Sequence, residues 1–211
     1  MIKRILLKLS GEILSGDGTE RIAPDVLSHF SKEIGSLSKK GVETAIVIGG
    51  GNIYRGAAGN PAIQRVTGDY MGMLATTINA LAIRDQLHYD GMSAEVMTPF
   101  HLTQMALTFS ASQAIKLLES GTILIFAGGT GNPFFTTDTA AALRACEIKA
   151  DMLVKGTKVD GIYDIDPKKY PYAIKYDTIS YDAVIRQNLQ VMDLTAILLC
   201  KDNLSLIHIS E

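Results

Sequence analysis

The sequence predicts an α/β protein, a three-layer αβα sandwich with a largely parallel central sheet. Short runs of apolar and often β-branched residues recur along the chain with little alternation between apolar and polar positions. Such runs are typical of strands that are covered on both faces. Helical patterns lie between them, and this order favours a parallel sheet that binds ligands beyond the carboxyl ends of its strands.

The individual elements can be placed along the chain. The apolar runs predict strands at 5–9, 44–48, 94–97, 123–126 and 152–154. Apolar residues at helical spacing predict a helix that begins near Pro24 and stops at Gly41. A second helical face runs from Met71 to Ala82, and a third helix is expected over 139–148.

Composition limits the classes of function. The 211 residues, 47% hydrophobic and 20% charged, fit a single domain over 1–211 or two closely joined lobes. A net charge of -2 gives no general attraction to nucleic acid or to an anionic membrane. Neither a signal peptide nor a membrane span is apparent, so we expect a cytoplasmic protein. The four histidines lack metal-binding spacing, and Cys146 and Cys200 are expected to be reduced.

The most informative segment is 128–138, GGTGNPFFTTD, which directly follows the strand at 123–126. Glycines allow the backbone to approach a ligand closely and to point N–H groups at an anion. Thr137 and Asp138 stand where a helix begins, so either of them is also a candidate cap for that helix. The segment predicts a binding site for a phosphorylated substrate.

Two other strand ends carry candidate phosphate ligands. Lys8 lies near the end of the first strand, and the second strand leads into three glycines followed by Arg55. We interpret the glycines as a close approach of backbone to ligand, and Arg55 as a bidentate phosphate ligand. Neither the Walker A nor the GxGxxG spacing is present. Asp69 fits a helix cap or a ligand contact, and the lysine-rich turn that starts at Lys155 reads as a solvated loop.

Six segments in order resemble the bacterial uridylate kinases, a family of the amino-acid-kinase superfamily. They are KRILLKLSGE, VIGGGNIYRG, GDYMGMLAT, GTGNPFFTTD, KGTKVDGIYDIDP and VMDLTA, and they lie between Lys3 and about Asn203. The resemblance implies the amino-acid-kinase fold and transfer of the γ-phosphoryl group of Mg-ATP to UMP, which gives UDP and ADP in pyrimidine nucleotide biosynthesis. It also implies a UMP-binding lobe over roughly 1–150 and an ATP-binding lobe over roughly 151–211.

Matched by position, the family pattern implies roles for individual residues. Catalytic roles fall to Lys8, Arg55, Asp138 and Asp193. UMP contacts fall to Gly50, Asp69, Thr130, Gly131, Asn132, Pro133, Phe134, Phe135, Thr136 and Thr137. ATP contacts fall to Lys8, Leu9, Ser10, Gly11, Gly51, Arg55, Thr157, Tyr163 and Asp166. No residue is assigned as a dedicated metal ligand, since Mg²⁺ is carried by ATP; Asp138 either positions Lys8 or engages a magnesium-bound water.

The resemblance further implies a homohexamer that GTP activates and UTP inhibits. The polar segment 16–21 matches the region linked to the GTP response. After Asn203 the sequence departs from the family pattern, and we expect a truncated or altered C-terminus there, although 206–209 retains a strand pattern. Two alternatives remain: a related kinase that acts on a carboxylate or carbamate, and a non-catalytic uridine-nucleotide sensor.

Overall fold

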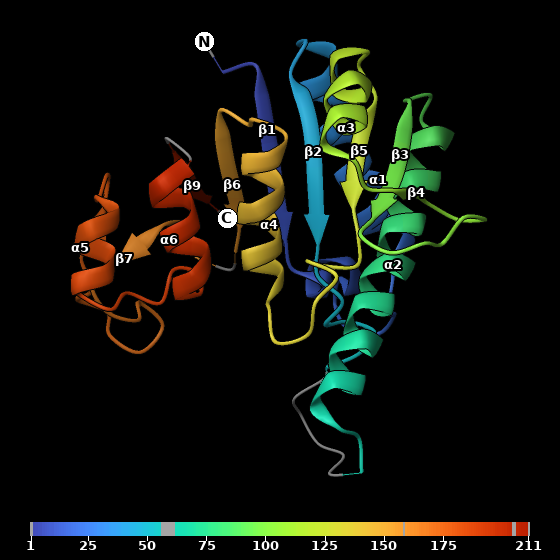
Figure 1. The fold of residues 1–211 in the computed structure, drawn as a ribbon. Coiled ribbons are helices and arrows are strands. Elements are labelled where there is room, and N and C mark those ends of the chain that lie inside the picture. The colour runs from blue at the N-terminus through green and yellow to red at the C-terminus, as the bar shows by residue number, and fades with distance from the viewer. Residues whose placement is uncertain (1, 56–61, 158, 204–205, 211) are drawn as a thin grey trace.

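The structure, a computed structural model, describes residues 2–55, 62–157, 159–203 and 206–210, and confirms the predicted α/β class. Its central sheet has seven parallel strands in the order β4-β3-β5-β2-β1-β6-β9 (Figure 1). These strands are β1 Arg4–Leu9, β2 Glu43–Ile48, β3 Ala94–Thr98, β4 Leu107–Thr108, β5 Ile123–Phe126, β6 Met152–Gly156 and β9 Ile207–Ser210. A separate antiparallel ribbon joins β7 (Ile162–Tyr163) to β8 (Lys175–Tyr176).

Helices cover both faces of the sheet and make three layers. They are α1 Pro24–Lys39, α2 Arg65–Tyr89, α3 Ala111–Glu119, α4 Thr137–Glu147, α5 Tyr181–Arg186 and α6 Leu194–Asn203, with a 3-10 turn η1 at Gly11–Ser15. Strand β2 contributes side chains to the cores on both faces of the sheet. Ala45 and Val47 pack in the core beneath α3 and α4. Ile46 and Ile48 pack in the core beneath α1 and α2. Because every residue of β2 is buried, the run shows no polar alternation.

Helix α2 begins earlier than the periodicity predicts. It starts at Arg65 with Gln64 as its N-cap, so Asp69 lies in the second turn, and the interpretation of Asp69 as a helix cap is wrong. Figure 1 shows the amino-terminal half of α2 running past the carboxyl ends of the strands. Apolar periodicity marks only the part of a helix that packs on a core, so it could not reveal these first turns.

The cap of α4 also differs from the prediction. Thr136, rather than Thr137 or Asp138, is the N-cap, and its hydroxyl accepts hydrogen bonds from the backbone N–H groups of Asp138 (3.1 Å) and Thr139 (3.3 Å). Thr136 has the extended backbone that a capping residue requires. The carboxylate of Asp138 is therefore left for other partners.

Several elements were not predicted from the sequence, namely β4, α3, β7, β8, α5 and α6. The strand pattern at 206–209 does form β9, which pairs with β6. Cys146 on α4 and Cys200 on α6 are free thiols, and burial raises the pKa of Cys200 to about 12. Among the described residues, no helix is long and apolar enough to cross a membrane.

Candidate active site

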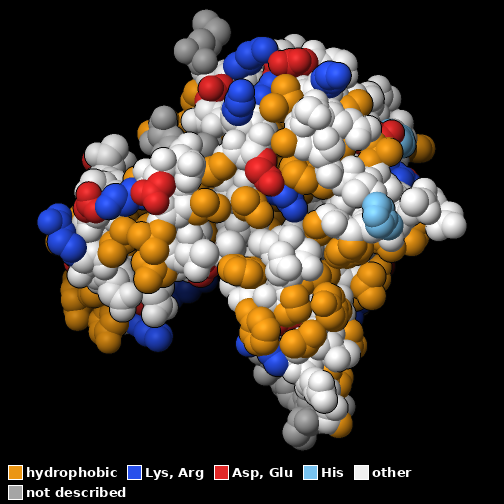
Figure 2. Space-filling model, viewed as in Figure 1, with side chains coloured by type: hydrophobic (Ala, Val, Ile, Leu, Met, Phe, Trp, Pro, Cys, Tyr) orange, Lys and Arg blue, Asp and Glu red, His pale blue; other side chains and the backbone are white. Residues whose placement is uncertain are grey.

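The candidate site lies at the carboxyl ends of β1 and β6. Figure 2 shows the surface hollowed between the part that carries α5 and β7 and the amino-terminal half of α2. Lys8 of β1 and Lys155 of β6 are register partners in the parallel sheet. Strand alternation places them on the same face as Leu6 and Leu153, which pack in the core beneath α4. Both ammonium groups therefore reach the amino end of α4.

The carboxylate of Asp138, in the first turn of α4, forms ion pairs with both lysines. One carboxylate oxygen lies 2.7 Å from Nζ of Lys8 and the other lies 2.7 Å from Nζ of Lys155. Burial by itself would raise the pKa of Asp138, but the charges of Lys8 and Lys155 outweigh that effect and hold the pKa below its ordinary value. In this structure Asp138 pairs directly with Lys8.

The amino ends of α4 and α6 meet beside this ion cluster. Asp193 caps α6 by accepting the N–H of Ala196 at 2.9 Å. It also accepts hydrogen bonds from the hydroxyls of Thr136 and Thr139, the latter at 2.9 and 3.0 Å. Helix amino ends carry partial positive charge. The arrangement of two lysines and two helix amino ends is suited to binding an anion.

A pocket of about 260 Å³ opens on one side of Asp138. Among its lining residues are Gly50, Gly51, Asp69, Thr130, Phe135, Thr136 and Thr137, all of them site residues predicted from the sequence. Asp69 accepts the backbone N–H of Phe134 at 2.8 Å and the Nε of Arg65 at 3.0 Å. Phe134 has a φ of 73°, and its ring lies 5.6 Å from the Arg65 guanidinium carbon. The turn at 130–137 is thereby held against α2.

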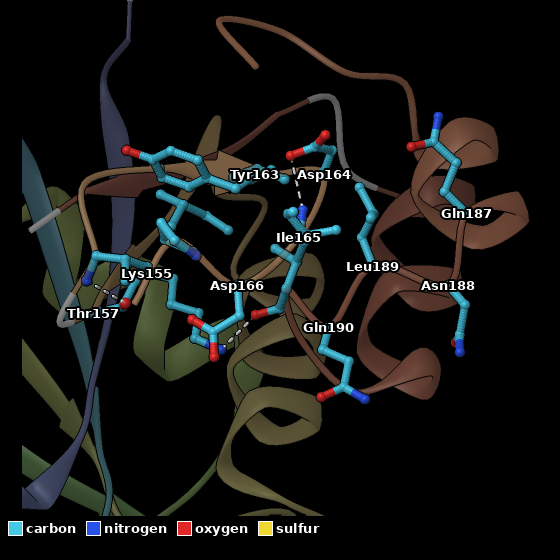
Figure 3. Close-up of a pocket in the computed structure, with 16 residues that line it drawn as sticks. Lys155, Thr157, Tyr163, Asp164, Ile165, Asp166, Gln187, Asn188, Leu189 and Gln190 are labelled. Carbon is cyan, nitrogen blue, oxygen red and sulfur yellow. Dashed lines mark hydrogen bonds between the residues drawn. The ribbon is translucent and has the colours of Figure 1, made fainter. Parts of the chain in front are cut away.

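A second pocket, of about 550 Å³, lies on the other side of the ion cluster. Figure 3 shows Thr157, Tyr163 and Asp166 around it, with Leu189 and Asn188 opposite. The hydroxyl of Tyr163 donates to Asp160 at 2.6 Å. Lys155 also lines this pocket, and its Nζ donates to the carbonyl of Val191 at 2.7 Å. The three residues predicted to hold the ATP base and ribose therefore share one cavity.

The glycine turn after β2 has a packing reason that the sequence reading did not include. A Cβ on Gly50 would lie 2.8 Å from Cβ of Ala75 on α2, and a Cβ on Gly11 would lie 2.4 Å from the carbonyl oxygen of Gly49. Only glycines allow these backbones to touch. The buried amides of Asn52 and Asn79 fix the same turn to α2 through reciprocal hydrogen bonds of 2.7 and 3.0 Å.

The remaining predicted residues are less closely gathered. Leu9, Ser10 and Gly11 follow Lys8, and Ser10 caps the turn η1. Arg55 has a 65% exposed side chain that pairs with Glu12, and it is absent from the lining of both pockets. Gly131, Asn132, Pro133 and Phe134 lie in the turn at 130–137 without lining the smaller pocket. Gly56, the last residue of the VIGGGNIYRG segment, lies outside the described residues.

Lys155 is the residue that the sequence reading missed. Its turn was interpreted as a solvated loop, and that interpretation is wrong for Lys155, which belongs to β6 and has a side chain only 15% exposed. The signal was its position, since Lys155, like Lys8, stands near the carboxyl end of an apolar strand. Nothing in the linear sequence indicates that the two strands are neighbours.

Comparison with known proteins places this geometry in a family. Residues 3–209 match the model of the amino acid kinase family. A uridylate kinase of Xanthomonas oryzae is 53% identical over 202 residues, which cover 95% of this chain and 84% of the relative. The crystal structure of UMP kinase from Bacillus anthracis has a TM-score of 0.95 at 39% identity, covering 100% of this chain and 87% of the other.

A second solved structure gives the same result. UMP kinase from Ureaplasma parvum has a TM-score of 0.92 at 37% identity, and the match covers 99% of this chain and 90% of that chain. The match extends over nearly the whole length of the chain. The chain belongs to the amino acid kinase family, among the proteins known as uridylate kinases.

Proposed function

We propose that this protein transfers the γ-phosphoryl group of Mg-ATP to UMP, giving UDP and ADP. The observation that carries the proposal is that lining residues of the two pockets flank Asp138 from two sides. The smaller pocket ends at Thr137, the residue before Asp138, and the larger is lined by Lys155, which is paired with Asp138. A donor nucleotide in the larger pocket and UMP in the smaller would bring their phosphates together at the ion cluster.

The chemistry follows from these positions. An oxygen of the UMP phosphate attacks the γ-phosphorus, the bond from that phosphorus to the bridging oxygen breaks, and ADP leaves with the electron pair. Phosphoryl transfer depends on alignment and on charge neutralisation. Lys8 and the amino ends of α4 and α6 meet the negative charge, while Asp138 and Asp193 hold these groups in place. The acceptor is already an anion, so no strong general base is needed.

Magnesium enters this proposal with the donor. Both oxygens of Asp138 face lysine ammonium groups, and those of Asp193 face hydroxyls and a backbone N–H. Among the described residues, no group of three or more potential metal ligands is present. The triphosphate oxygens would therefore hold the ion, which supplies charge neutralisation.

The test is release of ADP with UMP, CMP, dUMP or acetylglutamate as the acceptor, with and without GTP. We expect turnover with UMP, and we expect Lys8→Ala to reduce it by about 10³ to 10⁵ in a correctly folded protein. Phosphorylation of acetylglutamate in place of UMP would assign a carboxylate kinase. Binding of UMP without any ADP formation would assign a sensor.

The finer proposals concern assembly and regulation. We propose a cytoplasmic homohexamer that is activated by GTP, inhibited by UTP and active in pyrimidine nucleotide biosynthesis. Val66, Tyr70, Leu74 and Ile78, spaced four residues apart on α2, are 38–51% exposed, which supports burial of this face between subunits. The lobe boundary near residue 150 likewise remains a proposal. Light scattering on the purified protein measures the assembly, and the GTP arm of the assay measures activation.

A further inference from the structure

We infer that Lys155 is a second phosphate-binding cation beside Lys8. From its place on β6, the strand next to β1, Lys155 contacts the terminal phosphates of the bound nucleoside triphosphate. The identity of that nucleotide as ATP rests on the proposed function. The residues that carry the inference are Lys155, Lys8 and Asp138, together with the pocket that Lys155 lines.

The first argument is placement. Lys155 and Lys8 occupy the same register on neighbouring strands and reach the two oxygens of one carboxylate at the same distance, 2.7 Å. Their side chains are 15% and 11% exposed, whereas the surface lysine Lys169 is 75% exposed. A lysine side chain is rarely withdrawn from water to this extent without a charged partner. Lys155 is therefore built into the site and is not a surface lysine that happens to lie nearby.

The second argument is charge. Lys8 and Lys155 share the single carboxylate of Asp138, while the second carboxylate at the site, that of Asp193, is engaged by the hydroxyl of Thr139 and the backbone N–H of Ala196. Partly buried charge without compensation is costly. Phosphate oxygens would give the two ammonium groups the further anionic partners that Asp138 alone does not supply, and the terminal phosphates of a nucleoside triphosphate carry such oxygens.

The third argument is the position of Lys155 between the two pockets. It lines the larger pocket together with Thr157, Tyr163 and Asp166, while its Nζ reaches Asp138. A nucleotide whose base and ribose occupy this pocket must extend its phosphates past Lys155 to reach Lys8. An ammonium group has three donors, and the described residues engage two of those of Lys155, through Asp138 and Val191. The third is available to a phosphate oxygen.

A purely structural role is the competing explanation. The hydrogen bond from Lys155 to the carbonyl of Val191 ties the segment before α6 to β6, and this segment lines the larger pocket. If Lys155 only shaped the pocket, its loss would weaken every adenine nucleotide equally. If it binds the terminal phosphates, its loss would weaken ATP and leave AMP almost unaffected.

The experiment compares the binding of AMP, ADP and ATP, with magnesium ions, to the wild type, Lys155→Met, Lys155→Gln and Lys201→Met by calorimetry. We expect both Lys155 variants to bind ATP about 10-fold or more weakly and AMP within about twofold of the wild type. Lys155→Gln retains a donor for Val191, so it separates loss of charge from loss of that hydrogen bond. Lys201 pairs with Asp182 on the surface at 2.6 Å, and its substitution serves as the matched control.

The ratio of ATP to AMP affinity decides the question. Equal weakening of AMP and ATP, or unchanged ATP binding in a folded variant, would overturn the inference. If Lys155→Met does not fold, as judged by circular dichroism, Lys155→Gln provides the same ratio. Where UMP is phosphorylated, kcat should fall by about 10² to 10³, as for loss of one preorganised donor. Failure of the wild type to phosphorylate UMP would reject the proposed function and leave the binding comparison intact.

Discussion

Asp69 shows how one carboxylate can hold a loop and line a pocket together. It accepts the N–H of Phe134, so it holds the turn at 130–137, and it lines the smaller pocket. Its partner Arg65 lies four residues earlier on α2. Since α2 begins at Arg65, no capping function competes with these contacts. The residue is placed to influence binding in the smaller pocket and not in the larger.

Asp69→Asn is expected to raise the KM for UMP by about 10- to 100-fold and to leave the KM for ATP nearly unchanged, because hydrogen bonds to a charged group are lost at one pocket only. Steady-state kinetics with each substrate varied in turn measures the effect. Asp90→Asn, at the exposed carboxyl end of α2, is the control. Equal changes in both Michaelis constants would contradict a role confined to the smaller pocket.

At the scale of elements, the smaller pocket is lined where α2 packs against the turn that follows β2. A Cβ on Gly50 would lie 2.8 Å from Cβ of Ala75 and 3.0 Å from the carbonyl oxygen of Gly72, and the paired amides of Asn52 and Asn79 hold the turn in place. The absence of a side chain at Gly50 is therefore a packing requirement, whatever ligand lies above it. A Cβ on the next glycine, Gly51, would lie 3.8 Å from the side chain of Glu12.

This difference gives a matched pair of substitutions. Gly50→Ala should lower the free energy of unfolding by about 1–3 kcal/mol, the usual cost of overpacking, because its new methyl group meets Ala75. Gly51→Ala should leave the free energy of unfolding within about 0.5 kcal/mol of the wild type, since the new methyl group would make an ordinary van der Waals contact with Glu12. Urea denaturation measures both. A similar loss in the two variants would show that packing against α2 is not the reason for Gly50.

At the scale of the whole molecule, the two ends of the sheet have different charge chemistry. The carboxyl end carries Lys8 and Lys155, which pair with Asp138. The amino end carries a buried pair, in which Nε of Arg4 lies 2.6 Å from Glu43, and Lys3 joins the same carboxylate at 2.8 Å. Burial would raise the pKa of Glu43, but hydrogen bonds and charge from Lys3 and Arg4 lower it below the ordinary value of 4.5.

A group with a lowered pKa stabilises the fold above its unfolded pKa, and that contribution is lost as the pH falls through its folded pKa. Glu43 should therefore contribute fully above about pH 4.5 and progressively less in more acid solution. At pH 7, Glu43→Gln should cost about 3 kcal/mol of unfolding free energy, because Arg4 remains buried without its partner.

The measurement is urea denaturation between pH 3 and 7, with Glu33→Gln on the exposed face of α1 as the control. The deficit of Glu43→Gln relative to the wild type should shrink as the pH falls below about 4.5. A deficit that stays constant across this range would show that the ionised form of Glu43 does not stabilise the fold.

The sequence by itself determined the fold class, five strands of the sheet together with the strand pattern of β9, and most of the candidate residues. It could do so because burial on both faces leaves continuous apolar runs, as in β2, and because glycines and charged residues cluster at strand ends. Short elements such as β4 and α5 were not predicted because they have too few residues to show a periodic pattern of apolar side chains. The beginning of α2 was not predicted because its first turns project beyond the sheet and so lack the apolar pattern of a helix that packs on a core.

Only the tertiary structure decided which side chains act together. Strand order made β1 and β6 neighbours although Lys8 and Lys155 are far apart in the sequence, and α4 brought Asp138 between them. It also identified Thr136 as the cap of α4 and joined that cap to Asp193 at the start of α6. Local patterns report what each segment buries, whereas the meeting of distant segments depends on how the layers pack.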